Sequence, residues 1–237
     1  GEGAPHIVEY AVGKAGERYP ESSGKLLAAG SQLSMNMHLH PSGEETLVNT
    51  ALGLKLYPRG YKPERVQLSR VFPYPSHVEQ DDIDIAPGES NARTDSYHYV
   101  EQPMLITAFQ PHMHALGTYQ CLELIYPTKG TPARTDLVSC THWDYNWHMV
   151  YNYADDVAPI IPAGTVAHVI SWHDNTEAFR NNPDSKNWTG GGGGGRTIDE
   201  MAFAWLGWYD MTNEEYEKEL AERDALQEAV VATNQQQ

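Results

Sequence analysis

Two histidines separated by a single residue could share a metal ion in the segment Phe109 to Gly117. They are His112 and His114, and they follow the apolar, β-prone run Met104 to Phe109. Side chains of an extended strand alternate between its faces, so both imidazoles project to the same side, about 6 to 7 Å apart along the strand. The spacing favours a metal site on the face of a strand. The same spacing also occurs where two strand histidines are hydrogen-bonded to neighbours or solvent.

A third ligand is needed, and the candidate is Met201, in the segment Arg196 to Trp205. A thioether is a soft donor that suits copper, above all Cu(I), whereas zinc and iron sites rarely use it. Methionine in an apolar segment is also common as core filler. Taken together, the two imidazoles and the thioether predict a copper site formed by His112, His114 and Met201.

Length and charge narrow the class of protein. The chain has 237 residues, with 16 Lys and Arg against 32 Asp and Glu, giving a formal net charge of −16. A nucleic-acid partner is excluded because phosphate neutralisation requires a basic face. There is no apolar run long enough to span a membrane, and the first residue, Gly1, is not a start methionine, so we expect a processed or partial chain.

The spacing of apolar segments and turns predicts an all-β protein with a C-terminal helix. From Ile83 onward, strands and turns recur every eight to twelve residues, which is typical of a β-sandwich or jelly roll. Two earlier segments, Leu26 to Leu39 and Thr46 to Tyr57, also have the composition of strands. Thr212 and Glu215 form a capping box, so a helix of about four turns is expected from Asn213. The predicted divisions are a partial β domain (1–66), a complete β-sandwich (67–211) and an acidic helix and tail (212–237).

The two cysteines, Cys121 and Cys140, flank a predicted hairpin. Tyr119 to Tyr126 and Asp136 to Thr141 have the pattern of strands, and the residues between them, 127–132, are rich in turn formers. Folding about that turn brings the cysteines opposite each other. Either a cross-strand disulfide, which implies an oxidising compartment, or two buried thiols would fit this arrangement.

Several motifs together resemble the copper type II, ascorbate-dependent monooxygenases, the family of peptidylglycine α-hydroxylating monooxygenase and dopamine β-monooxygenase, and their bacterial members most of all. The resemblance spans residues 83–210. It lies in four motifs found in the family's order: Gln110-Pro111-His112-Met113-His114-Ala115-Leu116-Gly117, Trp143-Asp144-Tyr145-Asn146-Trp147, Asp174-Asn175 before Asn182-Pro183, and Thr197-Ile198-Asp199-Glu200-Met201.

The resemblance implies two jelly-roll domains that each carry one copper across a cleft. In the second domain, His112, His114 and Met201 match the catalytic copper ligands. Two imidazoles and one weak thioether leave an open position and favour the reduced ion that meets O₂. The other copper uses three histidines in the family, of which His38 matches one. The adjacent His-His pair of that site does not occur in this sequence.

The implied reaction is hydroxylation of an activated C–H bond in a small-molecule or peptide substrate, with ascorbate or another donor supplying electrons. The family also implies a secreted or periplasmic location. Residues 1 to about 66 match only the second half of the first domain. We therefore expect either a missing N-terminal portion or a protein partner to complete that domain. The alternative is a non-catalytic β-sandwich subunit of a larger extracytoplasmic assembly.

A third hypothesis is a cupin-like single-metal protein. His38, His40 and Glu44, with Pro162, Gly164 and His168 far downstream, approximate the two-part cupin metal motif, although the glycine spacing departs from it. That hypothesis requires His38, His40, Glu44 and His168 to converge, and imidazoles with a carboxylate suit Fe, Mn or Ni better than copper.

The remaining aromatic and histidine residues carry weaker predictions. Trp143, Tyr145 and Trp147 are expected to be core aromatics of the sandwich, with a role in the substrate cleft as the alternative. His173 is a candidate outer ligand beside the copper. The spacing of His148 argues for no site.

Overall fold

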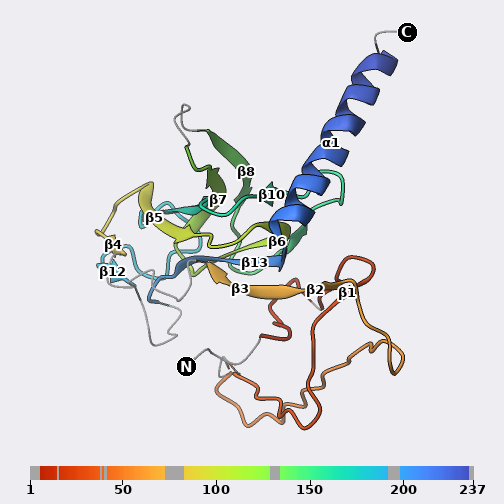
Figure 1. The fold of residues 1–237 in the computed structure, drawn as a ribbon. Coiled ribbons are helices and arrows are strands. Elements are labelled where there is room, and N and C mark those ends of the chain that lie inside the picture. Colours follow the sequence, from red (N-terminus) through yellow and green to blue (C-terminus); the bar gives the residue numbers. More distant parts are fainter. Residues whose placement is uncertain are drawn as a thin grey trace.

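The computed structural model describes residues 6–14, 16–37, 39, 42–72, 83–128, 134–191 and 198–234. The chain is an all-β sandwich of antiparallel sheets followed by one C-terminal helix (Figure 1). Its elements, in order, are β1 (Ser23–Gly24), β2 (Arg65–Val66), β3 (Leu68–Phe72), β4 (Asp84–Ile85), β5 (Ala92–Tyr99), β6 (Met104–Met113), β7 (Gly117–Ile125), β8 (Thr135–His142), β9 (Tyr151–Asn152), β10 (Ile160–Ile161), β11 (Val166–His173), β12 (Thr189–Gly190), β13 (Ala202–Asp210) and α1 (Asn213–Asn234).

Two sheets form the sandwich. One has the strand order β10-β6-β13-β3, with β9 also paired to β6, and is called here the β6 sheet. The other has the order β5-β11-β7-β8 and is called the β11 sheet. Two short pairs lie outside them: β1 with β2, which is parallel, and β4 with β12. The prediction of an all-β sandwich with a terminal helix is therefore confirmed.

The core lies between the two sheets and is built by alternation along the strands. Phe109 of β6, Leu206 of β13 and Leu122 of β7 belong to one apolar cluster and are almost completely buried. Positions that alternate with core residues face outward. They include His112, which precedes the buried Met113 in β6, and His168, which lies between the core residues Ala167 and Val169 in β11. The sandwich therefore has two outer faces, and each carries histidines.

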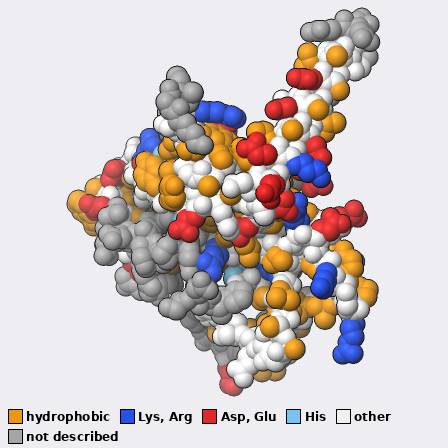
Figure 2. Space-filling view, viewed as in Figure 1, with side chains coloured by type: hydrophobic (Ala, Val, Ile, Leu, Met, Phe, Trp, Pro, Cys, Tyr) orange, Lys and Arg blue, Asp and Glu red, His pale blue; other side chains and the backbone are white. Residues whose placement is uncertain are grey.

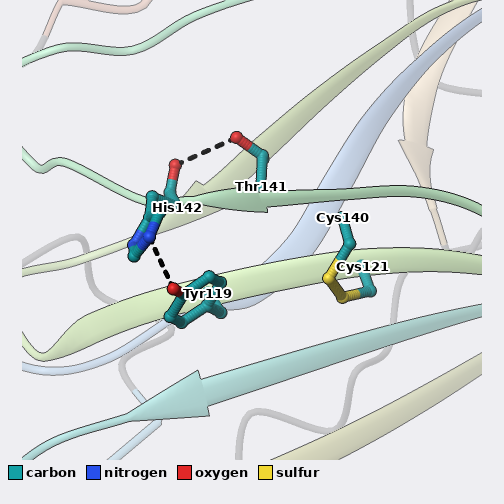
Figure 3. The surroundings of a disulfide bond; sticks show 5 residues. All are labelled: Tyr119, Cys121, Cys140, Thr141 and His142. Atoms are coloured by element: carbon teal, nitrogen blue, oxygen red, sulfur yellow. Dashed lines mark hydrogen bonds between the residues drawn. A yellow bond between two sulfur atoms is a disulfide. The ribbon is translucent and has the colours of Figure 1, made fainter.

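A disulfide joins the first hairpin of the β11 sheet, as Figure 3 shows. β7 and β8 pair antiparallel with Cys121 directly opposite Cys140, and the two sulfurs are bonded. This confirms the disulfide alternative. The pairing follows from local turn chemistry between two strand-forming runs, which is why the sequence contains enough information to predict it.

The terminal helix starts where its capping box predicts. The Glu215 amide donates to Thr212 Oγ1 and the Thr212 amide donates to a Glu215 carboxylate oxygen, which satisfies two otherwise unpaired donors. The helix has 22 residues, longer than the four turns expected, and it projects away from the sheets (Figure 1). Acidic side chains are spread along it in Figure 2. No helix among the described residues is both long and apolar enough to cross a membrane.

The prediction of strands between residues 26 and 57 is wrong. The described residues of this region form turns and extended chain but no strand, and large apolar side chains such as Leu26, Leu47 and Leu56 are exposed. A strand is stable only when its backbone groups pair with a neighbour, and β-prone composition does not supply one. The domain boundaries at 66 and 211 stay predictions. β2 and β3 follow each other directly across the first boundary.

Candidate metal site

The two strands that carry the candidate ligands are neighbours in the β6 sheet. β13 pairs antiparallel with β6, with Phe203 opposite His112 and Ala202 opposite Met113. The paired ladder ends at that last pair, and His114 and Met201 are the next residues beyond the ends of β6 and β13. Ala202 and Met113 are buried, and His112 and Phe203 alternate with them onto the outer face of the sheet. The segments that carry the candidate ligands, far apart in sequence, are therefore neighbours in the sheet, while the ligation by Met201 stays a prediction.

His114 is held in a defined orientation by its neighbours. Its ring Nδ1 lies 2.6 Å from the carbonyl oxygen of Asp199, and its own carbonyl accepts a hydrogen bond from the indole of Trp143. A histidine whose Nδ1 donates to a carbonyl presents the lone pair of Nε2, which is the usual arrangement of a metal-bound imidazole. Gly117 lets Trp143 approach, since a Cβ there would lie only 2.6 Å from Met113 Cβ and from Trp143 Cδ1.

His112 lies in a cluster of rings. It stacks on Phe203 at 4.5 Å between ring centres, and the rings of His114 and His148 lie 5.7 and 5.8 Å away. Two imidazoles bound to one ion at about 2 Å per nitrogen have ring centres roughly 5 Å apart, a spacing that follows from standard ligand bond lengths. The pair His112 and His114 is therefore close to the separation that a shared metal requires.

His148 is a histidine of this cluster that the sequence did not reveal. Its ring packs 4.5 Å from that of Trp143, and its Nε2 bonds the Tyr145 carbonyl. Burial lowers the pKa of His148, so the imidazole is neutral near pH 7. Its Nδ1 is buried with no hydrogen-bond partner in the described part of the chain. No spacing to His112 would have found it, because an irregular loop after β8 delivers it.

A buried carboxyl lies directly behind the candidate ligands. Glu200 is 1% exposed, and its carboxylate accepts hydrogen bonds from the backbone amides of His114 and Leu116. Burial raises the pKa of Glu200 to about 7, although these bonds oppose the rise. His173 Nε2 lies 3.6 Å from the same carboxylate and 3.5 Å from the Met201 carbonyl oxygen, and burial lowers its pKa to about 4. His173 thus packs against Glu200 and the backbone of Met201, and its role as an outer ligand stays a prediction.

A small cavity lies further along the β6 sheet, and neither His112 nor His114 lines it. It has a volume of about 60 Å³ and lies between the N-terminal segment and the β6 sheet. Gln110 and Trp205 line it, and each is two residues along its strand from His112 and Phe203, respectively. Gln67 Oε1 and Trp205 Nε1 are buried with no hydrogen-bond partner among the described residues, so the cavity is lined by one acceptor and one donor in need of a partner.

The N-terminal segment closes that cavity through a buried ion network. Lys14 is 6% exposed, and its ammonium donates to Gln110 Oε1 at 2.9 Å and to Glu17 at 2.8 Å. Burial raises the pKa of Glu17, but the bonds to Lys14 and Lys25 outweigh this and lower it overall. The wall of the cavity on the side of the N-terminal segment therefore carries charged side chains, among them Lys14, Glu17 and Arg18.

Other predicted ligands lie elsewhere. His38 and His40 lie outside the described residues, so the second copper site and the cupin set stay predictions. Glu44 is exposed, while His168 is buried on the outer face of the β11 sheet. Each ring nitrogen of His168 lies 2.7 Å from a carboxylate, Nδ1 from Glu123 and Nε2 from Asp95.

The donor set at the first site fits copper better than harder metals. Within the described part of the chain, no three His, Cys, Asp or Glu side chains are grouped so that they could hold a metal ion. A site with only two imidazoles needs a donor of another kind, and the residue that the register supplies is a thioether. That combination suits Cu(I). The orientation of His114 by Asp199 and the pairing of the strands that border His114 and Met201 are the structural features consistent with this fit.

Comparison with known proteins adds no family assignment. No protein-family model matches this chain, and no curated protein sequence matches it.

Proposed function

We propose that this protein binds copper through His112, His114 and Met201 and is a copper-dependent, O₂-using monooxygenase or a derivative of one. The observation that carries the proposal is the pairing of β6 with β13, which ends at Ala202 opposite Met113, so that Met201 and His114 are the next residues of two paired segments. The bond from His114 Nδ1 to Asp199 supports it, because it sets the tautomer a metal-bound imidazole needs.

Copper bound there would supply the redox chemistry that activates O₂ for hydroxylation of a C–H bond, with ascorbate or another donor as reductant. The protein's own residues would orient the imidazoles and limit water at the site. Trp143 and Asp199 fix His114, and Phe203 covers one face of His112. The aromatic rings around His112 and His114 provide uncharged surroundings, and with soft ligands such surroundings favour Cu(I).

The cavity lined by Gln110 and Trp205, two residues along the strands from His112 and Phe203, favours a small polar end group as the part of the substrate bound there. A volume of about 60 Å³ is far below that of sites for drug-sized ligands, so the bulk of a small-molecule or peptide substrate would lie outside. Gln67 Oε1 would accept a hydrogen bond from this group and Trp205 Nε1 would donate one. A secreted or periplasmic location would agree with the disulfide.

The test is to measure bound copper per chain and ascorbate-dependent O₂ uptake in the wild type and in Met201→Ala. We expect about one tightly bound copper in the wild type and loss of O₂ uptake in the variant. Met149→Ala, at a partly exposed methionine outside the site, is the matched control and should behave as wild type. Unchanged activity in Met201→Ala would remove Met201 from the ligand set.

A second candidate role is that of a subunit completed by another chain or by a further segment of this one. The exposed apolar side chains of residues 26–58 support it, because contiguous exposed apolar surface marks interaction sites. Alternating positions Leu52, Leu54 and Leu56 would suit pairing with an added strand. Light scattering at several concentrations tests self-association, and replacing Leu52 and Leu54 by Ser should abolish any assembly found.

A further inference from the structure

Glu200 occupies an unusual position for a carboxylate. It sits one residue before Met201, is almost fully buried, and points at the end of β6. Its Oε2 accepts the backbone amide of His114 at 2.8 Å, and its Oε1 accepts the backbone amide of Leu116 at 2.7 Å. The Glu200 side chain therefore links the segment that carries Met201 to the segment that carries His114.

The ion pairs of the described residues give Glu200 no lysine or arginine partner, and the ionisable group nearest to it is His173. A buried carboxylate without a cation costs stability unless it is richly hydrogen-bonded. The backbone amides of residues 114 and 116 supply those bonds. Glu200 provides what an apolar side chain at this buried position could not, namely two hydrogen-bond acceptors at a fixed separation.

We propose that Glu200 is a positioning residue that sets the separation and orientation of His114 and Met201. This inference rests on the proposed copper site. The two carboxylate oxygens receive amides from alternate residues of the turn after β6, where the Gly117 amide also bonds the His114 carbonyl. Any shift of the 114–116 turn relative to residues 200 and 201 would break one of these two bonds. Ligands of a metal site must be held to within about half an ångström, and this clamp provides that restraint.

The chemistry of possible replacements sharpens the assignment. Glutamine keeps the length and one acceptor, but its amide nitrogen would face a backbone N–H where an acceptor is required. Aspartate keeps both acceptors but is one methylene too short to reach both amides. Glu200→Gln is therefore the test variant, because it removes one bond of the clamp with least change in volume.

The experiment is a competition titration with Cu(I) and a chromophoric chelator, together with electron paramagnetic resonance of the Cu(II)-loaded protein. We expect Glu200→Gln to bind Cu(I) 10- to 100-fold more weakly than wild type, as for losses of groups that orient metal ligands. The copper hyperfine splitting should change as well, which a general loss of stability would not produce. Glu123→Gln is the matched control, because Glu123 bonds His168 on the other sheet, and it should leave both readouts unchanged.

The outcomes separate this inference from the proposal it rests on. If the wild type binds no Cu(I), both the proposed copper site and the positioning role of Glu200 are overturned. If the wild type binds copper and Glu200→Gln binds it with equal affinity and an identical spectrum, the positioning role is overturned and the copper site stands. If Glu200→Gln fails to fold, hydrogen exchange of the backbone amides in the wild-type protein tests the positioning role instead. Cu(I) should slow exchange at the amides of residues 114 and 116 at least about tenfold, and should leave that of Leu122 unchanged, since coupling is reciprocal. Equal exchange with and without copper would overturn the role.

Discussion

The two outer faces of the sandwich use histidine in opposite ways. On the β11 sheet, His168 lies between Asp95 and Glu123, and each ring nitrogen meets a carboxylate at 2.7 Å. Its interactions are complete, and they bind three neighbouring strands together. On the β6 sheet, His112 stacks on Phe203, and Nδ1 of His114 lies against the backbone carbonyl of Asp199.

This difference teaches which strand histidines are candidates for metal binding. An imidazole whose two nitrogens each lie against a carboxylate has no nitrogen left for a metal ion. An imidazole that donates one N–H to a carbonyl still has a lone pair on the other nitrogen. The β6 face therefore has the chemistry of a site, and the β11 face has the chemistry of a structural network. The predictions below test that division.

The largest expected effect is the loss of copper binding when an imidazole of the β6 face is removed. His114→Ala should weaken Cu(I) binding about 1,000-fold, roughly 4 kcal/mol, because a donor is deleted and no other described imidazole occupies its place. Competition titration with a Cu(I) chelator measures the change.

The control for this variant is His168→Ala on the β11 face, which should keep wild-type affinity for Cu(I). If His168→Ala lost copper as strongly as His114→Ala, the division between the two faces would be wrong.

The next effect concerns the stability of the β11 sheet alone. Replacing Cys121 and Cys140 by Ser removes a crosslink between residues 19 positions apart. We expect the free energy of unfolding to fall by roughly 3 kcal/mol, mainly because the unfolded chain gains conformational freedom. Urea denaturation with and without a reductant measures this.

Copper affinity should be unaffected by the loss of the disulfide, because the β6 and β13 segments that carry the ligands lie in the other sheet. A parallel loss of copper affinity would mean that the two faces are not independent.

A smaller effect is expected on stability when the structural histidine is removed. His168→Ala should lower the free energy of unfolding by about 2 kcal/mol, since Asp95 and Glu123 each lose a charge-assisted hydrogen bond but are partly exposed and can be hydrated. Thermal denaturation measures it. His142→Ala, at a histidine that bonds the exposed Tyr119, is the matched control and should change stability by much less. Equal losses of unfolding free energy in the two variants would show that the bonds of His168 to Asp95 and Glu123 do not stabilise the fold.

Features set by local sequence could be predicted, and those set by distant pairing could not. The hairpin of Cys121 and Cys140 follows from a turn-rich segment between two β-prone runs. The shared face of His112 and His114 follows from strand alternation alone. Met201 is different, because its position relative to His114 depends on the pairing of β6 with β13. Donor chemistry and the resemblance to a family made it a candidate, but neither fixes that pairing.

The failures have the same physical origin. The strands expected between 26 and 57 were inferred from composition, but composition does not provide the neighbouring strand they would need. The helix is longer than the four turns expected, because Glu, Ala and Gln sustain a helix by their intrinsic preference. His148 reaches the site on an irregular loop, where no periodicity applies.

The smallest effect concerns the acid stability of the β11 face. Burial raises the pKa of Asp95, but the bonds to Arg93 and His168 outweigh it and hold this pKa below its usual value. A lowered carboxyl pKa means that the unfolded state takes up protons first as the pH falls. The stabilisation is therefore complete above about pH 4 and is lost as the pH falls through the lowered pKa.

Because Asp95 is partly exposed and screened by solvent, we expect less than about 1 kcal/mol from this group. Urea denaturation between pH 6 and 2 measures it, with Asp95→Asn as the comparison. The difference in stability between wild type and Asp95→Asn should be constant above about pH 4.5 and should shrink below it. If the difference instead grew on acidification, Asp95 would be held in its protonated form in the folded protein. His168 would then lack one of its two charged partners, and it is these partners that distinguish it from the histidines of the β6 face.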